Sequence, residues 1–279
     1  MKHKLKRTSL ALLSGLLAIS AIGAARADDL VTTLKQTHQI TIGTANDPPL
    51  SYIGAQGEAL GVFPDILNEA FKRMNIQAKI HPVAMPFASL IPSLLSGRIQ
   101  IIGDSMYATP KRAEVISFTH TVFFNPESLD VAAGNPDHIT KLSDLCGKSA
   151  GSYEGTTFLT LLKQTNAACP AGKSIDIHAY PTLDNAFADL NAGRIQAVIA
   201  SGALSAYALT KNPALKFELV ATYTPVDRLH DNSAIGVPKA DKAFIADFNK
   251  AYESMLADGT AAKIFAKWGL TPTDYFLKP

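Results

Sequence analysis

Short apolar runs alternate with longer amphipathic segments along most of this chain of 279 residues. Three early runs have the length and apolar content of strands: Gln39–Gly43, Ala78–Val83 and Arg98–Ser105. Between them, hydrophobic residues recur on one helical face in Phe63–Met74, and Ser89–Leu95 is predicted as a helix capped by Gly97. The alternation continues in six later segments: Ser149–Ser152, Phe158–Gln164, Asp176–Ala179, Asp184–Asn191, Arg194–Ala200 and Asp241–Leu256. This pattern predicts an α/β fold with mostly parallel sheets.

One sequence pattern occurs twice, 96 residues apart. Residues 94–100 (LLSGRIQ) and 190–196 (LNAGRIQ) each combine a helix end, a glycine cap and the start of a strand. The strands that follow end at Ser105 and Ser201. The repeat predicts two similar lobes. Because ligands bind beyond the carboxyl ends of strands in open α/β sheets, two facing lobes would place these serines on opposite walls of one cleft.

The first 27 residues have the composition of a secretory signal. They hold five basic residues and no acid, an apolar stretch at Ser9–Ala24, and the small-x-small pattern Ala25-Arg26-Ala27. The apolar stretch is shorter than the roughly 20 residues of a membrane-spanning helix. We therefore interpret residues 1–27 as a signal peptide cleaved near Ala27, rather than as an anchor, and expect a periplasmic protein.

Without this segment, 21 basic side chains face 24 acidic ones, a net charge of −3. A nucleic-acid-binding protein usually keeps a basic surplus, so we expect no nucleic-acid partner. Hydrophobic residues make up 47% of the chain and charged residues 18%, as in a folded globular protein. The only cysteines, Cys146 and Cys169, are expected to form a disulfide, as pairs in exported proteins usually do.

Several familiar catalytic and cofactor motifs are absent from the sequence. It contains no G-x-G dinucleotide fingerprint, no complete phosphate-binding loop and no S-x-x-K nucleophile motif. Six histidines beyond the signal segment lack metal-ligand spacing: His38, His81, His120, His138, His178 and His230. We therefore predict no catalytic residue, no metal and no cofactor.

Two segments have features of anion sites. In the first, Thr109 and Pro110 suit the start of a helix whose first turn carries Arg112, a guanidinium able to bind a carboxylate at two points. The alternative is a surface arginine near Glu114.

The second segment lies in the other half of the chain. Gly155 allows a sharp turn, and Thr156 and Thr157 precede the helix expected at Phe158–Gln164. Simple capping of that helix by threonine is the alternative. Together, the two segments suggest that one carboxylate is held between two lobes.

The sequence from about Gln39 to Leu270 resembles the family 3 periplasmic solute-binding proteins of ABC importers. Seven segments, in this order and spacing, carry the resemblance: GTANDPPLSY (43–52), GVFPDIL (61–67), FASLIPSLLSGRIQ (87–100), TPKR (109–112), LCGKSAGSYEGTT (145–157), AGRIQAV (192–198) and DGTAAKIFAKWG (258–269). The resemblance implies a two-lobed type II binding-protein fold with two crossing strands as its hinge, which closes on a small ligand.

The resemblance also implies the lobes and the partners. Lobe 1 is expected at residues 38–130 and 232–279 and lobe 2 at 131–231, with Ser128–Ala133 and Ser233–Val237 near the crossings. We expect a monomer that captures a carboxylate-bearing, zwitterionic amino acid or derivative and delivers it to a membrane permease.

Family roles carry over to several positions. Arg112 matches the arginine that binds the ligand carboxylate, helped by Thr157. Ser105 and Tyr107, with Asp104 beside them, match the wall of lobe 1, and Phe87 matches an aromatic residue that packs on the ligand. With Asp47, Thr156 and Ser201, discussed above and below, these form the expected ligand-binding set.

Two positions depart from the family pattern. Ser201 stands where the aspartate for the ligand amino group is expected, and Asp47 replaces the aromatic residue that usually precedes the two prolines. We expect Asp47 to supply the missing charge, the alternative being that it only shapes the Asn-Asp-Pro-Pro turn. The loop at Ala45–Pro48 is similar to that of ectoine-type binders, so ectoine-like binding stays open.

An enzyme is the competing class, because cyclohexadienyl dehydratases share the fold that the resemblance implies. Such an enzyme needs a positioned acid and base, for which Asp47, Asp104 and Glu154 are available. No motif assigns them to these roles, and we expect a binding protein.

Overall fold

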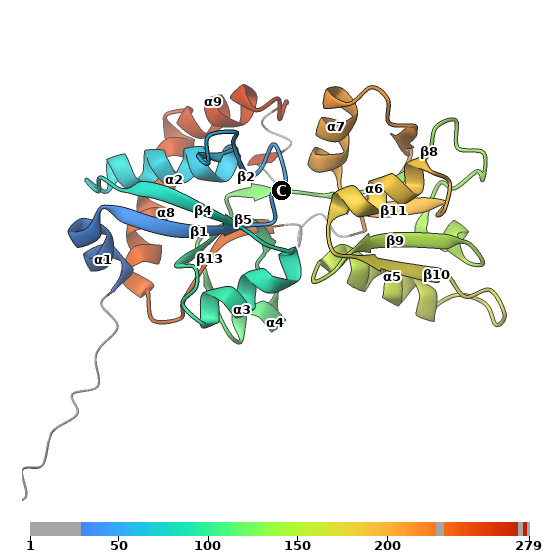
Figure 1. Cartoon of the computed structure of the whole chain (residues 1–279), viewed down its shortest axis with the longest axis horizontal. Coiled ribbons are helices and arrows are strands. Elements are labelled where there is room, and N and C mark those ends of the chain that lie inside the picture. Colours follow the sequence, from blue (N-terminus) through green and yellow to red (C-terminus); the bar gives the residue numbers. More distant parts are fainter. Residues whose placement is uncertain (1–28, 227–231, 273–275, 278–279) are drawn as a thin grey trace, which may run out of the picture.

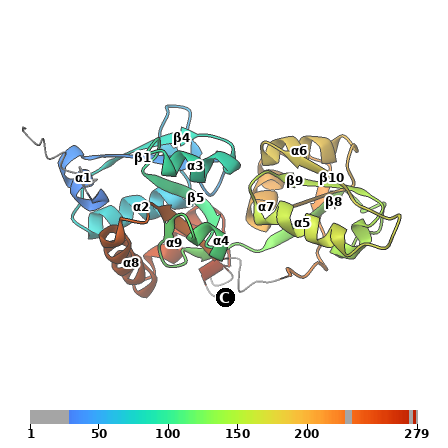
Figure 2. The same cartoon turned by 90° about the horizontal axis from the view of Figure 1, so that it is seen from below.

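The computed structural model describes residues 29–226, 232–272 and 276–277; the expected signal peptide and its cleavage point lie outside them. Two lobes lie side by side, each a sheet flanked by helices (Figures 1 and 2). Within the described ranges, no helix combines the length and the apolar character that a membrane crossing requires.

The first lobe is built on a sheet with strand order β4-β1-β5-β13-β6, and β7 also pairs with β13. Its strands are β1 (Gln39–Thr44), β4 (Lys79–Ala84), β5 (Ile101–Tyr107), β6 (Ser117–Phe118), β7 (Phe123–Phe124) and β13 (Asn232–Val237), and β2 (Tyr52–Ile53) and β3 (Ala59–Leu60) form a separate hairpin. Its helical segments are α1 (Leu30–Thr37), α2 (Val62–Arg73), η1 (Phe87–Ser89), α3 (Leu90–Leu95), α4 (Pro110–Ala113), α8 (Lys242–Ala257) and α9 (Thr260–Lys267). The amphipathic pattern of α2 explains its place, because its apolar face, which includes Phe63, Ile66 and Phe71, is buried.

The second lobe has the strand order β10-β9-β11-β8-β12. Its strands are β8 (Glu127–Ala132), β9 (Ser149–Tyr153), β10 (Asp176–Tyr180), β11 (Ala197–Ser201) and β12 (Phe217–Leu219). Its helical segments are η2 (Leu142–Leu145), α5 (Thr157–Ala167), α6 (Leu183–Asn191) and α7 (Gly202–Lys211). Helices α5 and α6 lie on opposite sides of the sheet (Figure 2).

The two sheets share one arrangement. In each, three parallel strands (β4-β1-β5 and β10-β9-β11) are followed by an antiparallel strand, β13 or β8. The sheets are therefore mixed, and the expected parallel pairing holds for the part of each sheet built from strand–helix–strand units. The antiparallel neighbours are the strands that lead to or from the other lobe.

The repeated GRIQ motif occupies equivalent places in the two lobes. Gly97 and Gly193 end their helices with φ of 73° and 70°, a conformation that favours glycine. The glutamine of each motif then bonds to the central parallel strand of its lobe, β1 or β9. The Gln100 side chain accepts a hydrogen bond from Thr41 N at 2.9 Å, and that of Gln196 accepts one from Ser149 N at 2.8 Å. The repeat thus helps to fix β5 beside β1 in the first lobe and β11 beside β9 in the second.

The first crossing between the lobes is short. Phe124 still pairs with β13 in the first sheet, and Glu127 already pairs with β11 in the second, so Asn125 and Pro126 make the crossing. The expected lobe limits at 130 and 131 stay a prediction; they would divide β8, all of which belongs to the second sheet. Helix α1 lies before the expected start of lobe 1 and is tied to it by the bond from Leu30 N to Asp241 Oδ1.

The expected disulfide is confirmed. Cys146 at the end of η2 and Cys169 just after α5 are bonded, with their Cα atoms 5.6 Å apart. The bridge holds the connection after α5 to the segment that enters β9, so it stabilises the second lobe.

Candidate functional site

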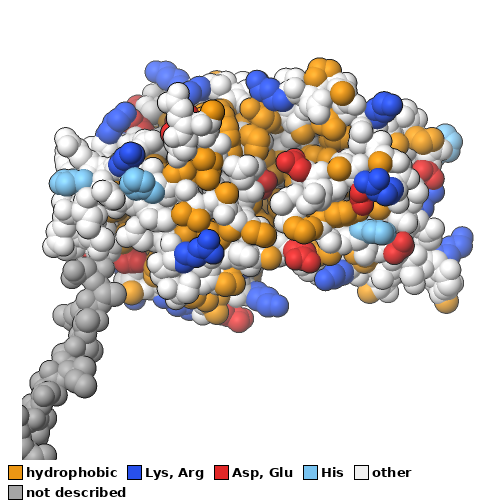
Figure 3. Space-filling model, in the orientation of Figure 1, with side chains coloured by type: hydrophobic (Ala, Val, Ile, Leu, Met, Phe, Trp, Pro, Cys, Tyr) orange, Lys and Arg blue, Asp and Glu red, His pale blue; other side chains and the backbone are white. Residues whose placement is uncertain are grey.

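A narrow cavity lies between the lobes at the carboxyl ends of β5 and β9. It is lined from the first lobe and the crossing by Asp47, Phe87, Ser105, Tyr107, Arg112 and Asn125, and from the second by Tyr153, Thr156, Thr157, Phe158 and Leu204. It encloses about 10 Å³, roughly the space of one water molecule. A solute of amino-acid size therefore enters only if the lobes move apart. Hydrophobic side chains gather where the lobes meet, with acidic side chains among them (Figure 3).

Arg112 is held in this cavity by the start of α4. Thr109 caps the helix by accepting a hydrogen bond from Arg112 N at 3.3 Å, and Pro110 is its first residue, as the sequence predicts. The guanidinium donates to Tyr107 O and to Gly155 O, each at 2.9 Å, and lies 5.4 Å from the centre of the Phe87 ring. Burial lowers the pKa of Arg112 to about 10. A half-buried cation of this kind gains free energy from a bound carboxylate.

The opposite wall is the start of α5. Thr156 accepts a hydrogen bond from Leu159 N at 3.2 Å and donates one to Tyr153 O at 2.7 Å, so its hydroxyl serves the helix cap. Thr157, the first residue of α5, lines the cavity beside it. For the Thr156 hydroxyl the structure thus favours the capping alternative, while Thr157 and Phe158 at the helix start also line the cavity.

Gly155 brings the lobes into close contact. Its φ is +80°, and a Cβ placed there would lie 2.7 Å from Ala88 Cα in the first lobe. No other residue type adopts this conformation without strain and also fits this gap. The glycine predicted for a sharp turn is therefore also needed for the lobes to approach.

Four aromatic rings meet across the cavity, two from each lobe. The ring centres of Phe87 and Tyr153 are 5.8 Å apart, those of Tyr107 and Phe158 5.6 Å, and those of Tyr153 and Phe158 6.2 Å. The first two pairs cross at 79° and 81°, which is the edge-to-face arrangement favoured by aromatic rings. Aromatic rings from both lobes therefore form part of the cavity wall.

Asp47 brings a carboxylate to the same cavity. Its turn is held by the backbone, with Asp47 N donating to Ser51 O at 2.8 Å and Leu50 N donating to Asp47 O at 2.9 Å. Within the described residues no hydrogen bond or ion pair reaches the carboxylate, so the turn does not use the side chain. Burial and the nearby charges of Asp104 and Asp184 raise the pKa of Asp47.

Asp104 is buried beneath this loop and does not line the cavity. Its carboxylate accepts hydrogen bonds from Ala45 N (2.5 Å), Ser105 N (2.7 Å) and Thr44 Oγ1 (3.2 Å). Burial raises its pKa to about 6, and these donors oppose the rise. Asp104 therefore positions the loop that carries Asp47, instead of lining the wall as the sequence predicts.

Ser105 and Ser201 are joined through a residue that the sequence analysis did not identify, Asn125. Ser201 Oγ donates to Asn125 Oδ1 at 2.6 Å, and Asn125 Nδ2 donates to Ser105 Oγ at 3.0 Å. Ser105 Oγ also bonds Ser233 Oγ at 2.7 Å. Of the two serines only Ser105 lines the cavity. The two serines were expected on opposite walls of a cleft. In the structure they are instead linked by hydrogen bonds through Asn125, which lies at the crossing between the lobes.

Seven of the nine expected ligand residues line the cavity, and Asp104 and Ser201 support it. The structure adds Asn125, Tyr153, Phe158 and Leu204. Tyr153 could have been predicted from the sequence, because it follows a predicted strand at the edge of the sheet where ligands bind. For Asn125 the sequence offered no indication of a site role beyond its place before Pro126. In the described part of the chain, His, Cys, Asp and Glu nowhere gather in threes suited to a metal.

Two further cavities of about 390 and 270 Å³ share Asp47 with the site, and Asp184 at the start of α6 lines both. A second acidic group therefore lies near Asp47.

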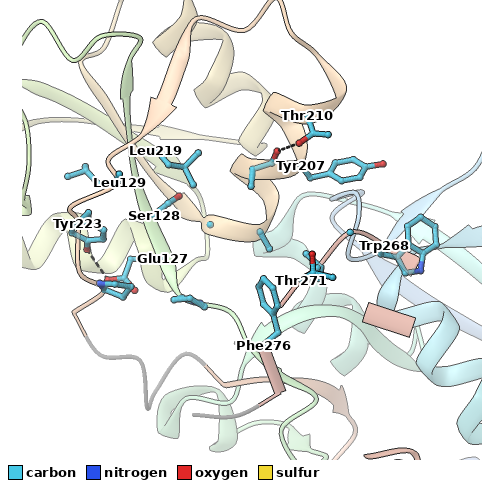
Figure 4. Close-up of a pocket in the computed structure, with 18 of the residues that line it drawn as sticks. Glu127, Ser128, Leu129, Tyr207, Thr210, Leu219, Tyr223, Trp268, Thr271 and Phe276 are labelled. Atoms are coloured by element: carbon cyan, nitrogen blue, oxygen red, sulfur yellow. Dashed lines mark hydrogen bonds between the residues drawn. The ribbon is translucent and has the colours of Figure 1, made fainter. Parts of the chain in front are cut away.

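A larger cavity of about 750 Å³ lies elsewhere between the lobes, among α7, β8 and the segment after α9 (Figure 4). Tyr207, Trp268 and Phe276 line it, and Glu127 accepts from Tyr223 Oη at 2.9 Å. None of the expected ligand residues lines this cavity.

Comparison with known proteins is consistent with this geometry. The profile of the bacterial extracellular solute-binding proteins, family 3, matches residues 40–271. The chain is 32% identical to the lysine/arginine/ornithine-binding periplasmic protein of Escherichia coli (strain K12), covering 91% of this chain and 95% of that protein. It is 33% identical to the histidine-binding periplasmic protein of Salmonella typhimurium (strain LT2), covering 82% and 87%.

Solved structures show the same architecture. An ancestral arginine-binding protein bound to arginine superposes with a TM-score of 0.73 at 27% identity, covering 83% of this chain and 98% of that one. An ancestral amino-acid-binding protein described as a precursor of cyclohexadienyl dehydratase has the same TM-score at 22% identity, with 85% and 98% covered, which shows the shared fold. The predicted two-lobed fold is thus confirmed.

Proposed function

The chain belongs to the bacterial extracellular solute-binding proteins of family 3, and we propose that it captures a zwitterionic amino acid or amino-acid derivative in the periplasm for the permease of an ABC importer. The observation that carries this proposal is that Arg112 and Asp47 line one cavity between the lobes. Arg112 would bind the carboxylate of the solute, and Asp47 its cationic group.

The capture cycle follows from the geometry. With the lobes apart, a solute can reach Arg112 and Asp47 on the first lobe. On closure, the N-terminus of α5 approaches the same carboxylate, because free N–H groups at a helix start favour an anion. The described contacts of Arg112 with Gly155 and of the aromatic rings across the cavity would then hold the lobes together around the solute.

The site would be reached from outside the cytoplasm. The relatives named above are periplasmic proteins, and a disulfide suits an oxidising compartment. We propose that the mature protein begins after Ala27 and acts as a monomer. Mass spectrometry of the exported protein and light scattering on it test these two points.

Binding is tested by a thermal-shift screen of amino acids, opines, betaines and ectoines, followed by calorimetry. A ligand of the folded protein raises the melting temperature by mass action. Arg112→Ala should abolish the shift, whereas Lys111→Ala, an exposed change in the same helix turn, should keep it. A ligand that binds equally to wild type and Arg112→Ala would contradict the proposed site.

Enzymatic activity is the alternative that this fold allows. Asp104 is tied to backbone N–H groups and Glu154 is exposed, and neither lines the cavity beside Asp47. We propose that the protein is not an enzyme. Incubation with arogenate or prephenate tests this, and sustained product formation would overturn the proposal.

A further inference from the structure

A cavity of about 390 Å³, here called the side cavity, lies next to the candidate ligand cavity. Asp47 of the first lobe and Leu204 of the second line both, so these two side chains lie where the cavities meet. The ligand cavity encloses about 10 Å³, whereas 390 Å³ lies in the usual range of small-molecule sites, about 300 to 1,000 Å³. A solute held by Asp47 is therefore next to a cavity large enough for a further part of it.

Seven of the thirteen described residues that line the side cavity are apolar. One of them, Pro48, comes from the first lobe, and the other six come from the second. Helices α6 and α7, which supply most of the six, lie on the side of the second lobe that faces the first (Figure 1). A chain placed in the side cavity would therefore contact both lobes. The six residues are Leu183, Phe187 and Ala188 of α6, Leu204 and Ala208 of α7, and Leu215.

Apolar surface of the side cavity is still in contact with water. Pro48, Ala208 and Leu215 are partly exposed, so a chain placed against them would cover apolar surface as well as bury its own. The charged residues Asp184 and Lys211 also line the cavity, and both are exposed. Because exposed charges stay hydrated, neither requires a charged partner on the solute.

We infer that the side cavity holds the aliphatic chain of the solute whose carboxylate and cationic group meet Arg112 and Asp47. The protein would then select zwitterionic amino acids with a long chain over those with a short one. This inference rests on the proposed function and deepens it. The chain passes Asp47 and Leu204 on its way from one cavity to the other. Each methylene that leaves water there should tighten binding by ~4-fold, until the chain reaches the exposed edge.

Two homologous series of amino acids test the inference by calorimetry on the wild-type protein. One series ends in a methyl group and runs from L-alanine through L-norvaline and L-norleucine to L-2-aminooctanoate. The other ends in an ammonium group and runs from L-2,4-diaminobutyrate through L-ornithine to L-lysine. Using both keeps the test independent of the end group, which can meet Asp184 or Lys211. We expect affinity to rise by ~10-fold or more from the shortest to the longest member in at least one series.

A variant that fills the side cavity tests where the chain lies. Ala188 lines the side cavity but not the ligand cavity, and it is exposed, so Ala188→Phe takes up space with little effect on folding. The shortest member of the responding series should bind this variant within ~3-fold of wild type, which also shows that the variant is folded. The longest member should lose ~10-fold or more. Ala167→Phe, an exposed change at the end of α5 and outside the cavities described above, is the control and should change neither affinity.

The outcomes separate the inference from the proposed function. Affinities that do not rise with chain length in either series would overturn the inference, as would the same length dependence in Ala188→Phe as in wild type. If no member of either series binds while another zwitterion from the thermal-shift screen does, the inference fails and the proposed function stands. If no zwitterion binds at all, the proposed function fails, and the inference fails with it.

Discussion

The Arg112 side chain of the first lobe donates a hydrogen bond to the Gly155 carbonyl of the second, at 2.9 Å. One residue thus lines the ligand cavity and links the lobes. A carboxylate bound to the other edge of the guanidinium would share Arg112 with this contact. If Arg112 binds the ligand as proposed, ligand binding and lobe closure would be coupled through this side chain.

Arg112→Ala should weaken binding of a zwitterionic ligand by more than ~2 kcal/mol, because a charged partner inside the closed cleft is lost. Arg112→Lys should recover only part of it, since an ammonium lacks the two-point geometry. Calorimetry checks both, with Lys111→Ala as the control in the same turn. An affinity of Arg112→Ala equal to wild type would leave Arg112 a purely structural role.

Asp47→Asn should cost at least ~1.5 kcal/mol of ligand binding, and Ser201→Ala less than half as much. The physical reason is that Asp47 lines the cavity with a carboxylate that has no protein partner among the described residues, whereas the Ser201 hydroxyl is used by Asn125. A large loss at Ser201 with none at Asp47 would reverse the assignment.

The same carboxylate predicts a pH dependence. Because burial and the nearby acids raise the pKa of Asp47, it takes up a proton as the pH falls through that raised value, and attraction for a cation is lost. Affinity should therefore weaken toward acidic pH in wild type and vary less in Asp47→Asn. Calorimetry from pH 5 to pH 8 measures the difference, and parallel profiles would count against Asp47.

Gly155→Ala should impair closure, since its Cβ would meet Ala88 Cα. Gly172→Ala is the matched control, because Gly172 has a similar φ of +78° in the same lobe and no atom within 4 Å of an added Cβ. Both changes strain the backbone, but only Gly155→Ala should also weaken ligand binding. We expect its affinity to fall by ~10-fold or more, which corresponds to a loss of about 1.4 kcal/mol of binding free energy. Equal affinities in the two variants would show that the contact is dispensable.

Asp130 makes the second lobe sensitive to pH. It is fully buried, with Ser205 Oγ donating to Oδ2 at 2.6 Å and, among the described residues, no partner for Oδ1. Burial raises its pKa to about 7, above the unfolded value near 4, so the folded state binds the extra proton. Stability therefore falls as the pH rises from about 4 through 7, by an amount on the order of a few kcal/mol.

Asp130→Asn should remove this dependence, because a neutral amide replaces the charged form. Its melting temperature should exceed that of wild type at pH 8.5 and approach it at pH 5. Asp247→Asn, an exposed change, serves as the control. Thermal melts at both pH values decide, and a destabilised Asp130→Asn at pH 8.5 would contradict the prediction.

Much of the fold was readable from sequence because its determinants are local. The predicted strand Gln39–Gly43 ends one residue before β1 does, and the predicted helix Phe63–Met74 is shifted by one residue relative to α2. The agreement is close because the apolar periodicity of a segment reflects which of its faces is buried. The repeated GRIQ motif indicated two equivalent lobes, and its glycines and glutamines do the same work in each. The pairing of Cys146 with Cys169 could be predicted because the chain has only these two cysteines and a segment typical of exported proteins.

The site was only partly readable. Arg112, Asp47 and Phe87 were found because each stands in a recognisable segment, and all three line the cavity. The roles of Asp104 and Ser201 depended on which neighbours would use their polar atoms. Those neighbours, Thr44, Ala45 and Asn125, are set by the packing of loops and the crossing.

The sequence by itself thus determined the elements, the two-lobed plan and the charges available to a ligand, because these follow from periodicity, capping and residue type. Only the tertiary structure decided which of those groups remain free. Hydrogen bonds between residues as far apart as Asn125 and Ser201 tie up the hydroxyl at the expected cation site, and the four aromatic rings come together only when both lobes meet. Such pairings depend on the meeting of distant segments, which no local pattern in the chain encodes.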